Sequence, residues 1–460
     1  MNKKLTYQSN AFFDEYITNN SSPRKGFKRS IGFFNSLTGS QKIYFKKLCE
    51  SSISSMGVTF QLNADELKDR LWPLDLIPRI ISLNKWEIVE CGLSQRVKAL
   101  NLFINDVYNK QEFLNKNPVL KDLILDSPNF LSECMGISPK NKVWSNICGT
   151  DLIRNHNGDF FVLEDNLRVP SGVAYMLENR NIMKRVIPEL FNSYEVNPVD
   201  DYPSQLYQCL CDASFSTNQK KTIVVLTPGV FNSAYFEHSY LAQQMGVELV
   251  EASDLYVSRS GNVLMKTING PKKIDVIYRR VDDIYLDPKT WLKNSTLGIQ
   301  GIYKSWKSKK VAIVNAPGSG VADDKAVYAY VPKMIKFFLN ERPIISQVKT
   351  YVCAIKKDLD YVVNNIDQLV LKPVNESGGY GILIGPQASK SELKEYKLKI
   401  MNNPRNFVAQ PLIRLSTAPT LIGKNIVPRH LDLRPFILSG KKSFVTKGGL
   451  TRVAMKKGST

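Results

Sequence analysis

The chain has 460 residues, of which 43% are hydrophobic and 10% aromatic. That length and composition describe a folded protein of about two to four domains with a large buried core, and they exclude a disordered chain. The formal net charge of +20 would suit a nucleic-acid partner. However, the lysines are spread along the chain, and no helix-turn-helix, RNP or zinc-finger pattern accompanies them. We therefore expect a lysine-rich surface that attracts acidic substrates, and no specific nucleic-acid partner.

The cysteine and histidine content argues against a disulfide framework and against a zinc site. The seven cysteines are scattered without a CxxC pair, and the three histidines are far apart in the sequence. No window approaches about 18 consecutive apolar residues, and the start, MNKKLTYQSNAFFDEY, lacks the apolar core of a signal peptide. We expect a soluble, cytoplasmic protein without a membrane partner.

The first part of the chain leads into a predicted hairpin. Residues 1–145 are expected to be mainly helical, because apolar positions recur with helical spacing in SQRVKALNLFINDVYNKQEFL (95–114). The stretch GTDLIRNHNGDFFVLEDNLR (149–168) then reads as two strands joined by a turn. Asn157-Gly158 predicts a two-residue type I′ loop, since both residues tolerate positive φ. With that loop Asp151 lies directly opposite Glu164, and Asn166 shares their face.

The predicted pairing of two carboxylates raises an electrostatic conflict. Facing carboxylates repel each other unless a positive charge lies between them. Oxygen ligands without Cys or His suit a hard cation such as Mg²⁺, which commonly also holds substrate phosphates. The alternative is that both acids point to solvent and are screened.

An α/β unit follows the hairpin. KKTIVVLTPG (220–229) predicts a buried strand, residues 231–246 a helix that ends at Gly246, and VELVEASDLYV a second strand. This β-α-β pattern implies parallel strands with a right-handed crossover, and it lacks the GxGxxG dinucleotide fingerprint. Two further predicted strands, in DVIYRRVDD (275–283) and KVAIVNAPGSG (310–320), end in polar residues, where α/β sheets bind ligands.

A third unit contains QLVLKPVNESGGYGILIG (368–385), which predicts a strand, a glycine loop and a strand. Lys372 ends the first strand and precedes the glycines. Glycines let backbone N–H groups approach phosphate closely, and a lysine supplies a point charge. An ordinary glycine-containing turn fits equally well. Lys325, which opens a helical pattern after NAPGSG, is either a second phosphate ligand or a surface lysine.

These motifs together resemble the circularly permuted ATP-grasp type 2 family, relatives of glutathionylspermidine synthetase-like carboxylate-amine ligases. The resemblance runs from about residue 70 to residue 460. It rests on the stretches GTDLIR, FVLEDNLRVPSGVAYMLENR, LTPGVFNSAYFEH, YRRVDD, NAPGSGVADDKAVYAYVP, LKPVNESGGYG, RHLDLRPF and GGLTRVA. In ordinary ATP-grasp enzymes the lysine and glycine-loop motifs precede the acidic hairpin. Here the hairpin comes first, which is the permutation.

The resemblance implies an α/β class with α+β elements: a circularly permuted ATP-grasp fold, similar to the ATP-binding domain of glutathione synthetase, with a pre-ATP-grasp β-α-β domain. The expected parts are a helical N-terminal region (1–145), a metal-binding part of the core (146–210), the pre-ATP-grasp domain (211–345), a lid (346–415) and C-terminal core strands (416–460). Relatives continue beyond the GGLTRVA stretch, which implies that a piece of the site or of the core sheet is missing from this chain.

The resemblance also implies roles for single residues. Asp151, Glu164 and Asn166 would bind two Mg²⁺ ions, and Lys325 and Lys372 would hold the phosphates of ATP. The loop of Gly378, Gly379, Tyr380 and Gly381 would close over the nucleotide, and Gln410 would belong to the hinge against which adenine packs. Family chemistry would be attack of a carboxylate on the γ-phosphate, giving an acylphosphate that an amine captures. We expect Lys325 and Lys372 to converge on the hairpin.

One departure concerns the arginine of the site. Many ATP-grasp ligases carry an arginine two positions before the first metal-binding acid, and here that position is Gly149. The candidates to stabilise the transferring phosphoryl group instead are Arg168, Arg434 and Arg452. Each of them could equally be an ordinary salt-bridging arginine.

Three functions follow from these observations. The first is a carboxylate-amine ligase with a small-molecule or peptide substrate pair. Arg279 and Arg280 are its candidates to recognise a substrate carboxylate, although they could instead pair with Asp282 or Asp283. The second is a non-catalytic ATP-binding or scaffold protein. The third, a nucleic-acid-binding protein, rests on charge alone.

Overall fold

The computed structural model describes residues 12–60, 70–374 and 381–454. Gly378, Gly379 and Tyr380 of the predicted glycine loop lie outside these ranges. The helices are α1 (Lys28–Ser36), α2 (Gly39–Ser55), α3 (Leu83–Val107), α4 (Glu112–Asn115), α5 (Pro118–Leu125), α6 (Val173–Val186), α7 (Pro188–Asn192), α8 (Tyr202–Ala213), α9 (Tyr235–Met245), α10 (Ile302–Lys307), α11 (Lys325–Tyr328), α12 (Val331–Leu339), α13 (Lys356–Asn364) and α14 (Lys390–Asn402). Within the described ranges, no helix is both long enough and apolar enough to cross a membrane.

The strands form several sheets, of which three position the site. The central sheet contains β3 (Ile147–Arg154), β4 (Phe160–Asn166), β12 (Ser346–Gln347), β17 (Thr417–Ile422), β18 (Asn425–Ser439) and β19 (Ser443–Val453). The parallel sheet contains β5 (Ile223–Leu226), β6 (Glu248–Val250), β10 (Val276–Arg279) and β11 (Ala312–Val314), and the lid sheet contains β13 (Tyr351–Val352), β14 (Leu369–Pro373), β15 (Leu383–Ile384) and β16 (Phe407–Pro411). Shorter strands are β1 (Thr59–Phe60), β2 (Arg70–Leu71), β7 (Leu255–Val257), β8 (Val263–Met265) and β9 (Lys272–Lys273).

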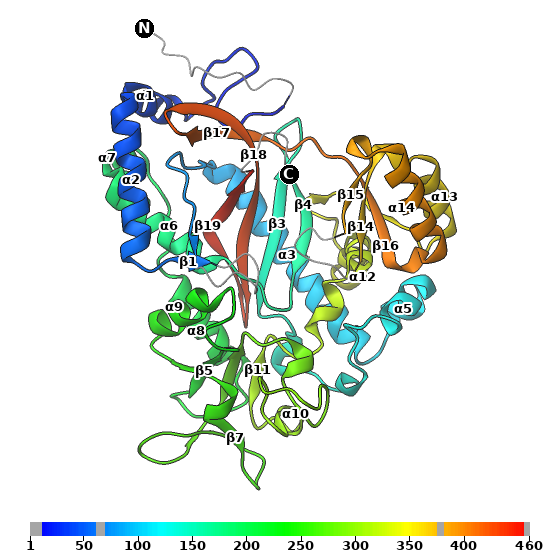
Figure 1. Cartoon of the computed structure of the whole chain (residues 1–460). Helices are drawn as coiled ribbons and strands as arrows, with labels where there is room; N and C mark the ends of the chain where they lie inside the picture. The colour runs from blue at the N-terminus through cyan, green and yellow to red at the C-terminus, as the bar shows by residue number, and fades with distance from the viewer. Residues whose placement is uncertain (1–11, 61–69, 375–380, 455–460) are drawn as a thin grey trace.

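The central sheet joins segments from distant parts of the sequence. Its order is β12-β4-β3-β18-β17, and β19 also pairs with β18. The hairpin of β3 and β4 therefore lies beside the long strand β18 near the C-terminus, as Figure 1 shows. The expected C-terminal core strands are thus neighbours of the predicted metal-binding part.

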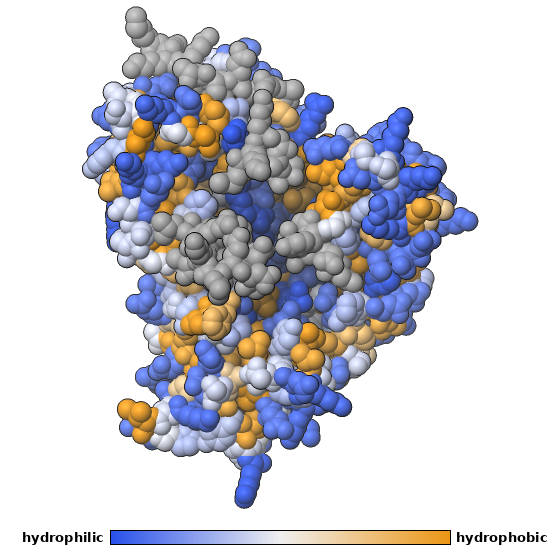
Figure 2. Space-filling model, viewed as in Figure 1, coloured by the Kyte–Doolittle hydropathy of each residue, from blue (hydrophilic) through white to orange (hydrophobic). Residues whose placement is uncertain are grey.

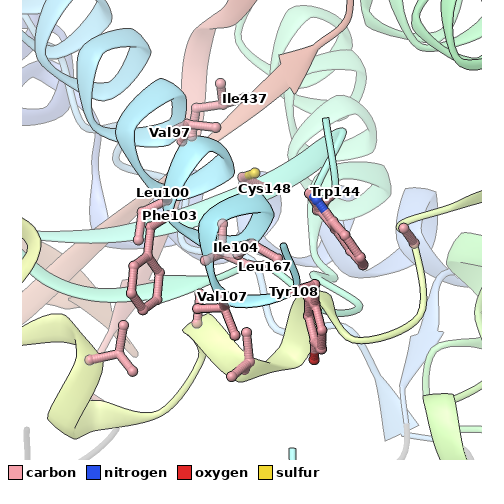
Figure 3. Close-up of a cluster of buried hydrophobic side chains, with 14 of the residues drawn as sticks. Val97, Leu100, Phe103, Ile104, Val107, Tyr108, Trp144, Cys148, Leu167 and Ile437 are labelled. Atoms are coloured by element: carbon pink, nitrogen blue, oxygen red, sulfur yellow. The ribbon is translucent and has the colours of Figure 1, made fainter. Parts of the chain in front are cut away.

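Helix α3 packs against one side of this sheet and supplies much of the main core. Val97, Leu100 and Ile104 recur at intervals of three and four residues, so they lie on one face of the helix, and all three are fully buried. Figure 3 shows this face against Cys148 of β3 and Ile437 of β18. The core therefore holds the hairpin and β18 in a fixed relation.

The parallel sheet confirms the predicted β-α-β unit. Its order is β11-β10-β5-β6, and α9 connects the parallel neighbours β5 and β6. The helix ends at Gly246, whose φ of 66° is the left-handed conformation that terminates many helices. In Figure 1 this sheet lies below the central sheet, with the carboxyl ends of its strands toward the hairpin.

The region expected to be the lid is a smaller layer of helices α13 and α14 on an antiparallel sheet in the order β13-β16-β14-β15, and we keep the name lid for this layer. It stands to one side of the central sheet in Figure 1. Strand β12 lies within the range expected for the lid but pairs with β4 in the central sheet. Lys372 and Gln410 both belong to the lid sheet, on the neighbouring strands β14 and β16.

The predicted two-residue hairpin loop is wrong, although the predicted pairing of the strands is confirmed. The backbone N–H of Gly158 donates to Asn155, and that of Asn155 donates to Asp159, so the loop has three residues. Of its residues only Gly158 takes a positive φ, 81°, because the Asn155 side chain accepts from the N–H groups of Asn157 and Asp159 and fixes an Asx turn. A register shift after Asp151 compensates for the longer loop, and Asp151 still pairs with Glu164.

Candidate active site

A cavity of about 410 Å³ lies where the central sheet, the parallel sheet and the lid approach one another. On the face shown in Figure 2, hydrophilic residues line a hollow between the lid and the rest of the molecule. The cavity is lined from the hairpin by Glu164, Asp165, Asn166 and Arg168, from the loop after β10 by Arg280, Asp282 and Tyr285, and from other segments by residues that include Asn129, Asn232, Asp323, Lys325 and Val374. A volume of this size suits a small-molecule ligand.

The predicted phosphate-binding lysines do converge on the hairpin. Lys325 begins α11, whose first turn is capped by the Asp324 carboxylate, and its Nζ lies 3.8 Å from Oε1 of Glu164. Lys372 reaches the same place from β14, and its Nζ donates to Oε1 of Gln410 at 2.8 Å. Gln410 in turn donates to Thr350 at 2.9 Å, which fixes the orientation of its amide.

The environment of Lys372 disfavours its charge. The pKa of Lys372 is lowered to about 8, mainly by burial; Glu164 opposes this shift and the nearby Lys325 adds to it. The ammonium group therefore faces both Glu164 and Lys325. An anion bound between the two lysines would favour the charged form of Lys372.

Asp151 has different partners from those expected of a metal ligand. Its carboxylate accepts from Arg434 Nε at 2.5 Å and Nη2 at 2.7 Å, and from Arg452 Nη2 at 2.8 Å. Burial alone would raise the pKa of Asp151, but the hydrogen bonds and charges of Arg434 and then Arg452 outweigh it and hold the pKa below its ordinary value. The charge repulsion predicted across the hairpin is thus offset by arginines.

Gly149 makes this contact possible. A Cβ atom at this position would lie 3.3 Å from Cδ of Arg434 and 3.3 Å from Cβ of Pro170. The stem of Arg434 from β18 therefore runs over β3 at the position where related ligases carry their own arginine. Asn166, which lines the cavity, donates from Nδ2 to the Gly149 carbonyl at 3.2 Å.

Arg168 lies at the other end of the cavity between two carboxylates. Its guanidinium is 3.1 Å from Asp282 and 3.7 Å from Asp323, and its side chain is 33% exposed. Burial opposes its charge, but Asp282 and Asp323 outweigh this and raise the pKa of Arg168. Burial also raises the pKa of Asp323 to about 7, with Glu164 and Asp283 adding to the shift against the influence of Arg168 and the Leu167 amide.

The two arginines expected to recognise a substrate carboxylate are deeply buried. Arg279 donates to the carbonyls of Asn315 and Val281 and pairs with Asp283 at 2.5 Å, so it supports the ends of the parallel strands. Arg280 reaches the cavity wall, but its guanidinium is engaged by Glu237 at 3.0 Å and by the Pro170 carbonyl at 2.7 Å. Pairing with Asp283, weighed from the sequence, therefore holds for Arg279, whereas Arg280 pairs with Glu237.

Asn315 joins the parallel sheet to the hairpin. Its side chain accepts from the N–H groups of Asn146 and Ile147 at 2.8 and 2.9 Å, and donates to the carbonyls of Ile147 and Leu167 at 2.7 and 2.8 Å. Sequence reasoning did not single out this residue. It follows β11 in the chain, at the carboxyl end of a parallel strand, and that position was the available signal.

The same signal could have identified Asp282 and Asp323, which follow β10 and β11. Both lie in quoted motifs, yet neither was predicted as a site residue. For a metal ion, the described residues contain no group of three or more His, Cys, Asp or Glu side chains that could hold one. Glu164 and Asn166 do present oxygen atoms to the cavity beside Lys325, which fits a Mg²⁺ ion that is completed by phosphate and water ligands.

Comparisons with known proteins place this arrangement in a family. The sequence pattern of the family described as circularly permuted ATP-grasp type 2 matches residues 78–454. An uncharacterized protein of Synechocystis sp. is 45% identical to the chain, over 99% of the chain and 95% of that protein. An uncharacterized protein of Mycobacterium tuberculosis is 48% identical, over 88% of the chain and 73% of that protein.

A third relative and one solved structure are also similar to the chain. A Frankia casuarinae protein with the name "Putative glutamate--cysteine ligase 2-2" is 38% identical, over 88% of this chain and 47% of its own length. The structure of a glutathione synthetase-like effector from Globodera pallida superposes with a TM-score of 0.62 at 12% identity, covering 91% of this chain and 96% of the effector. That likeness shows a shared α/β fold. Because the family pattern covers most of the sequence, the chain belongs to the circularly permuted ATP-grasp type 2 family.

Proposed function

We propose that the protein is an ATP- and Mg²⁺-dependent ligase that joins a carboxylate to an amine through an acylphosphate. The observation that carries this proposal is the convergence of Lys325 and Lys372, from two distant segments, on Glu164, which lines the cavity together with Lys325. Two lysines close to a single carboxylate would be unfavourable in an apolar core, but they suit a site that binds phosphates together with a metal ion. The ligase name of the Frankia casuarinae relative agrees with this chemistry.

In this proposal the chain's own groups have separate tasks. Lys325 and Lys372 bind phosphate oxygens of ATP, and Gln410 and the loop that ends at Gly381 hold the nucleotide from the lid. Glu164 and Asn166 would hold Mg²⁺, which supplies charge stabilisation to the transferring phosphoryl group. Arg168, which lines the cavity, and Arg434 and Arg452 are our candidates to stabilise that group.

The reaction has two steps. A substrate carboxylate oxygen attacks the γ-phosphorus, and ADP leaves with the electrons of the broken bond. The nitrogen of the amine then attacks the acyl carbon, inorganic phosphate leaves, and the nitrogen gives up a proton. Arg279 is too deeply buried and too fully paired to serve the substrate carboxylate without rearrangement, so Arg280 is the better of the two candidates.

The test is Glu164→Gln, which keeps the shape of the side chain and removes its charge. Loss of metal-ion stabilisation of several kcal/mol predicts a fall in ADP release of about a thousandfold or more. Substrates would be found by measuring ADP release across amines, amino acids and short peptides. Since Glu164 is partly exposed and its partner Lys325 lies 3.8 Å away, unfolding free energy without metal should change by less than about 1 kcal/mol.

Glu395→Gln is the matched control, because Glu395 makes an exposed ion pair with Lys399 on α14, within the lid helix layer. This variant should keep wild-type ATP binding and ADP release. If Glu164→Gln also keeps both, the proposed site is wrong. If the wild type binds Mg²⁺-ATP but no substrate pair in the screen causes it to release ADP, a non-catalytic ATP-binding protein is the better description.

A further inference from the structure

We infer that Arg405 of the lid and Asp324, which precedes α11, are positioning residues that form an ion pair when nucleotide binds. The pair sets the distance between the two lysines of the site, Lys372 and Lys325. Neither Arg405 nor Asp324 is among the residues that line the cavity, so both act through their neighbours. This inference rests on the proposed function.

Asp324 holds the start of α11, the short helix that begins with Lys325. Its Oδ1 accepts from the backbone N–H of Ala326 at 2.8 Å, and the residue is 2% exposed. Among the described residues, no group donates a hydrogen bond to its other oxygen, Oδ2. A buried carboxylate oxygen without a donor is costly, so Oδ2 has the capacity to bind a cationic group.

Arg405 presents the complementary groups from the lid. It lies in the turn between α14 and β16, and its Nη2 donates to the carbonyl of Leu123 in the last turn of α5, which lies below the lid in Figure 1. Its Nε and Nη1 are shielded from solvent, and within the described part of the chain they have no acceptor. One nitrogen of the guanidinium is thus anchored, and the other two remain available for a carboxylate.

The two residues do not form a hydrogen bond, but they are close enough for their charges to interact. The pKa of Asp324 is raised, mainly by burial, while the Ala326 amide and then the charges of Arg405 and Lys325 oppose the shift. A short approach of Arg405 would therefore convert a weak attraction into a charge-assisted hydrogen bond, which is the stronger kind.

Two backbone hydrogen bonds show how this approach would move the lysines. The N–H of Lys325 donates to the carbonyl of Val374 at 3.4 Å, and the N–H of Val374 donates to the carbonyl of Asn406 at 3.0 Å. Val374 lies two residues after Lys372, and Asn406 directly follows Arg405. Lys372 and Arg405 therefore move together with the lid. The bond between Lys325 and Val374 is longer than usual, so the lid has room to approach α11.

The phosphates of the nucleotide would draw the lid in. The charge of Lys325 acts on Lys372 and contributes to its lowered pKa, which shows that the two lysines repel each other. An anion bound to both removes this repulsion and attracts Lys372 toward Lys325. Because Lys372 belongs to β14, the lid follows and brings Arg405 to Oδ2 of Asp324. The ion pair then stabilises the nucleotide-bound arrangement alone.

The probe for a test is Mg²⁺ with adenylyl imidodiphosphate, a non-hydrolysable ATP analogue, and calorimetry on the full chain would measure its affinity. Asp324→Asn removes the charge and keeps the start of α11, because asparagine is an equally good N-cap. Arg405→Gln removes the opposite charge. Each variant should weaken binding about tenfold, and the double variant should lie within about twofold of either one, because both changes remove the same pair.

Arg414→Gln is the matched control, because it removes one positive charge from an exposed position in the same lid region. It should keep affinity within about twofold, since exposed charges are screened. Losses that multiply in the double variant would overturn the inference, and so would wild-type affinity in Asp324→Asn. Denaturation without nucleotide should show no coupling between the two changes. Coupling of the same size there would mean that the pair supports the fold and not the bound nucleotide.

Hydrogen exchange of the wild type tests the inference without any variant. The probe should slow exchange of the Lys325 amide at least about tenfold, because its bond to Val374 shortens, and mass spectrometry of peptides that contain Lys325 would detect this. Unchanged exchange with the probe bound would contradict us. A wild type that does not bind the probe would refute the proposed function as well, whereas binding with independent effects of Asp324→Asn and Arg405→Gln refutes this inference alone.

Discussion

The stem of Arg434 occupies the space that a side chain at Gly149 would need. Arg434 belongs to β18 and lies 285 positions further along the chain. The glycine does not need positive φ here. What it provides is room, because a Cβ atom would be closer to Cδ of Arg434 and to Pro170 than side chains normally pack. The position of the guanidinium over β3 therefore depends on a hydrogen atom at Gly149.

Gly149→Ala should consequently disturb the site more than the fold. The methyl group would push Arg434 aside by a few tenths of an ångström, and we expect affinity for ADP with aluminium fluoride, which imitates the transferring phosphoryl group, to fall about tenfold. The melting temperature should change little, since alanine also lowers the entropy of the unfolded chain by an amount worth roughly 0.5–1 kcal/mol. Gly32→Ala in α1 is the control, because no atom lies within 4 Å of its added Cβ. It should leave ligand binding unchanged.

Lys372 makes a prediction about pH. With a pKa of about 8 in the free protein, its amine is about half protonated at pH 8. Bound phosphate favours the charged form and raises this pKa, so ATP binding near pH 8 should take up as much as about half a proton. Well below pH 7 the uptake by this group should vanish, and above pH 8 the affinity for ATP should fall. Calorimetry in buffers of different ionisation enthalpy measures the uptake.

Lys372→Arg is the matched control for this titration, because arginine stays charged throughout the range. The variant should bind ATP without proton uptake around pH 8. Uptake of the same size in Lys372→Arg would mean that another group titrates and that Lys372 does not contact phosphate.

Between elements, the pair of Arg96 and Asp165 holds α3 against the hairpin. Arg96 makes a bidentate contact with Asp165, at 2.8 Å from Nε and 2.6 Å from Nη2, and also donates to Gln347 of β12. Both charged side chains are 3% exposed. Asp165 lies between Glu164 and Asn166 in β4, and its carboxylate is directed to Arg96 of α3, although the residue also contributes to the lining of the cavity.

Asp165→Asn should therefore destabilise the protein strongly. Removing one partner of a buried ion pair leaves an uncompensated charge and costs about 3–5 kcal/mol of unfolding free energy. Chemical denaturation would measure this. Asp159→Asn is the comparison, because the ion pair of Asp159 with Lys85 is exposed and should be worth no more than about 1 kcal/mol. Similar losses in both variants would show that burial of the pair is not what matters.

The hairpin shows how far sequence reasoning reaches at this scale. Local turn chemistry and strand alternation were enough to pair Asp151 with Glu164, although the loop has three residues and a bulge restores the register. The partners of Asp151 could not be found in this way. Arg434 and Arg452 are 283 and 301 residues away, and only tertiary packing decides which arginine meets which acid. The family resemblance gave candidates but not their partners.

The whole molecule carries a charge of +20, and this makes a prediction about salt. Affinity for an arbitrary oligonucleotide would arise from spread surface lysines, so it should fall by about a thousandfold or more between 50 and 200 mM salt if six or more phosphates are contacted. Mg²⁺-ATP in the cavity is screened much less, and its affinity should change by less than about tenfold. Filter binding with both ligands would check this. Oligonucleotide affinity that survives 200 mM salt would revive a specific nucleic-acid function.

At this scale the sequence predicted the family and the fold class. It did not predict the shared cavity, because Asp282, Asp323 and Asn129 meet there only when three layers pack together. Polar residues at the ends of parallel strands indicated that a site lies at that edge. Which of them face the cavity, as Asp282 does, and which are buried in ion pairs, as Arg279 is, depends on packing.

The order of the central sheet also bears on how the protein is made. Strand β3 lies between β4 and β18, yet more than half of the chain separates Arg154 from Asn425. During synthesis the β3 edge of the hairpin therefore lacks its partner until β18 emerges. Unpaired edges promote aggregation, and contacts between distant segments slow folding. Asp151 lies on that edge, so the step that protects the nascent chain from aggregation is also the step that brings the two arginines to it.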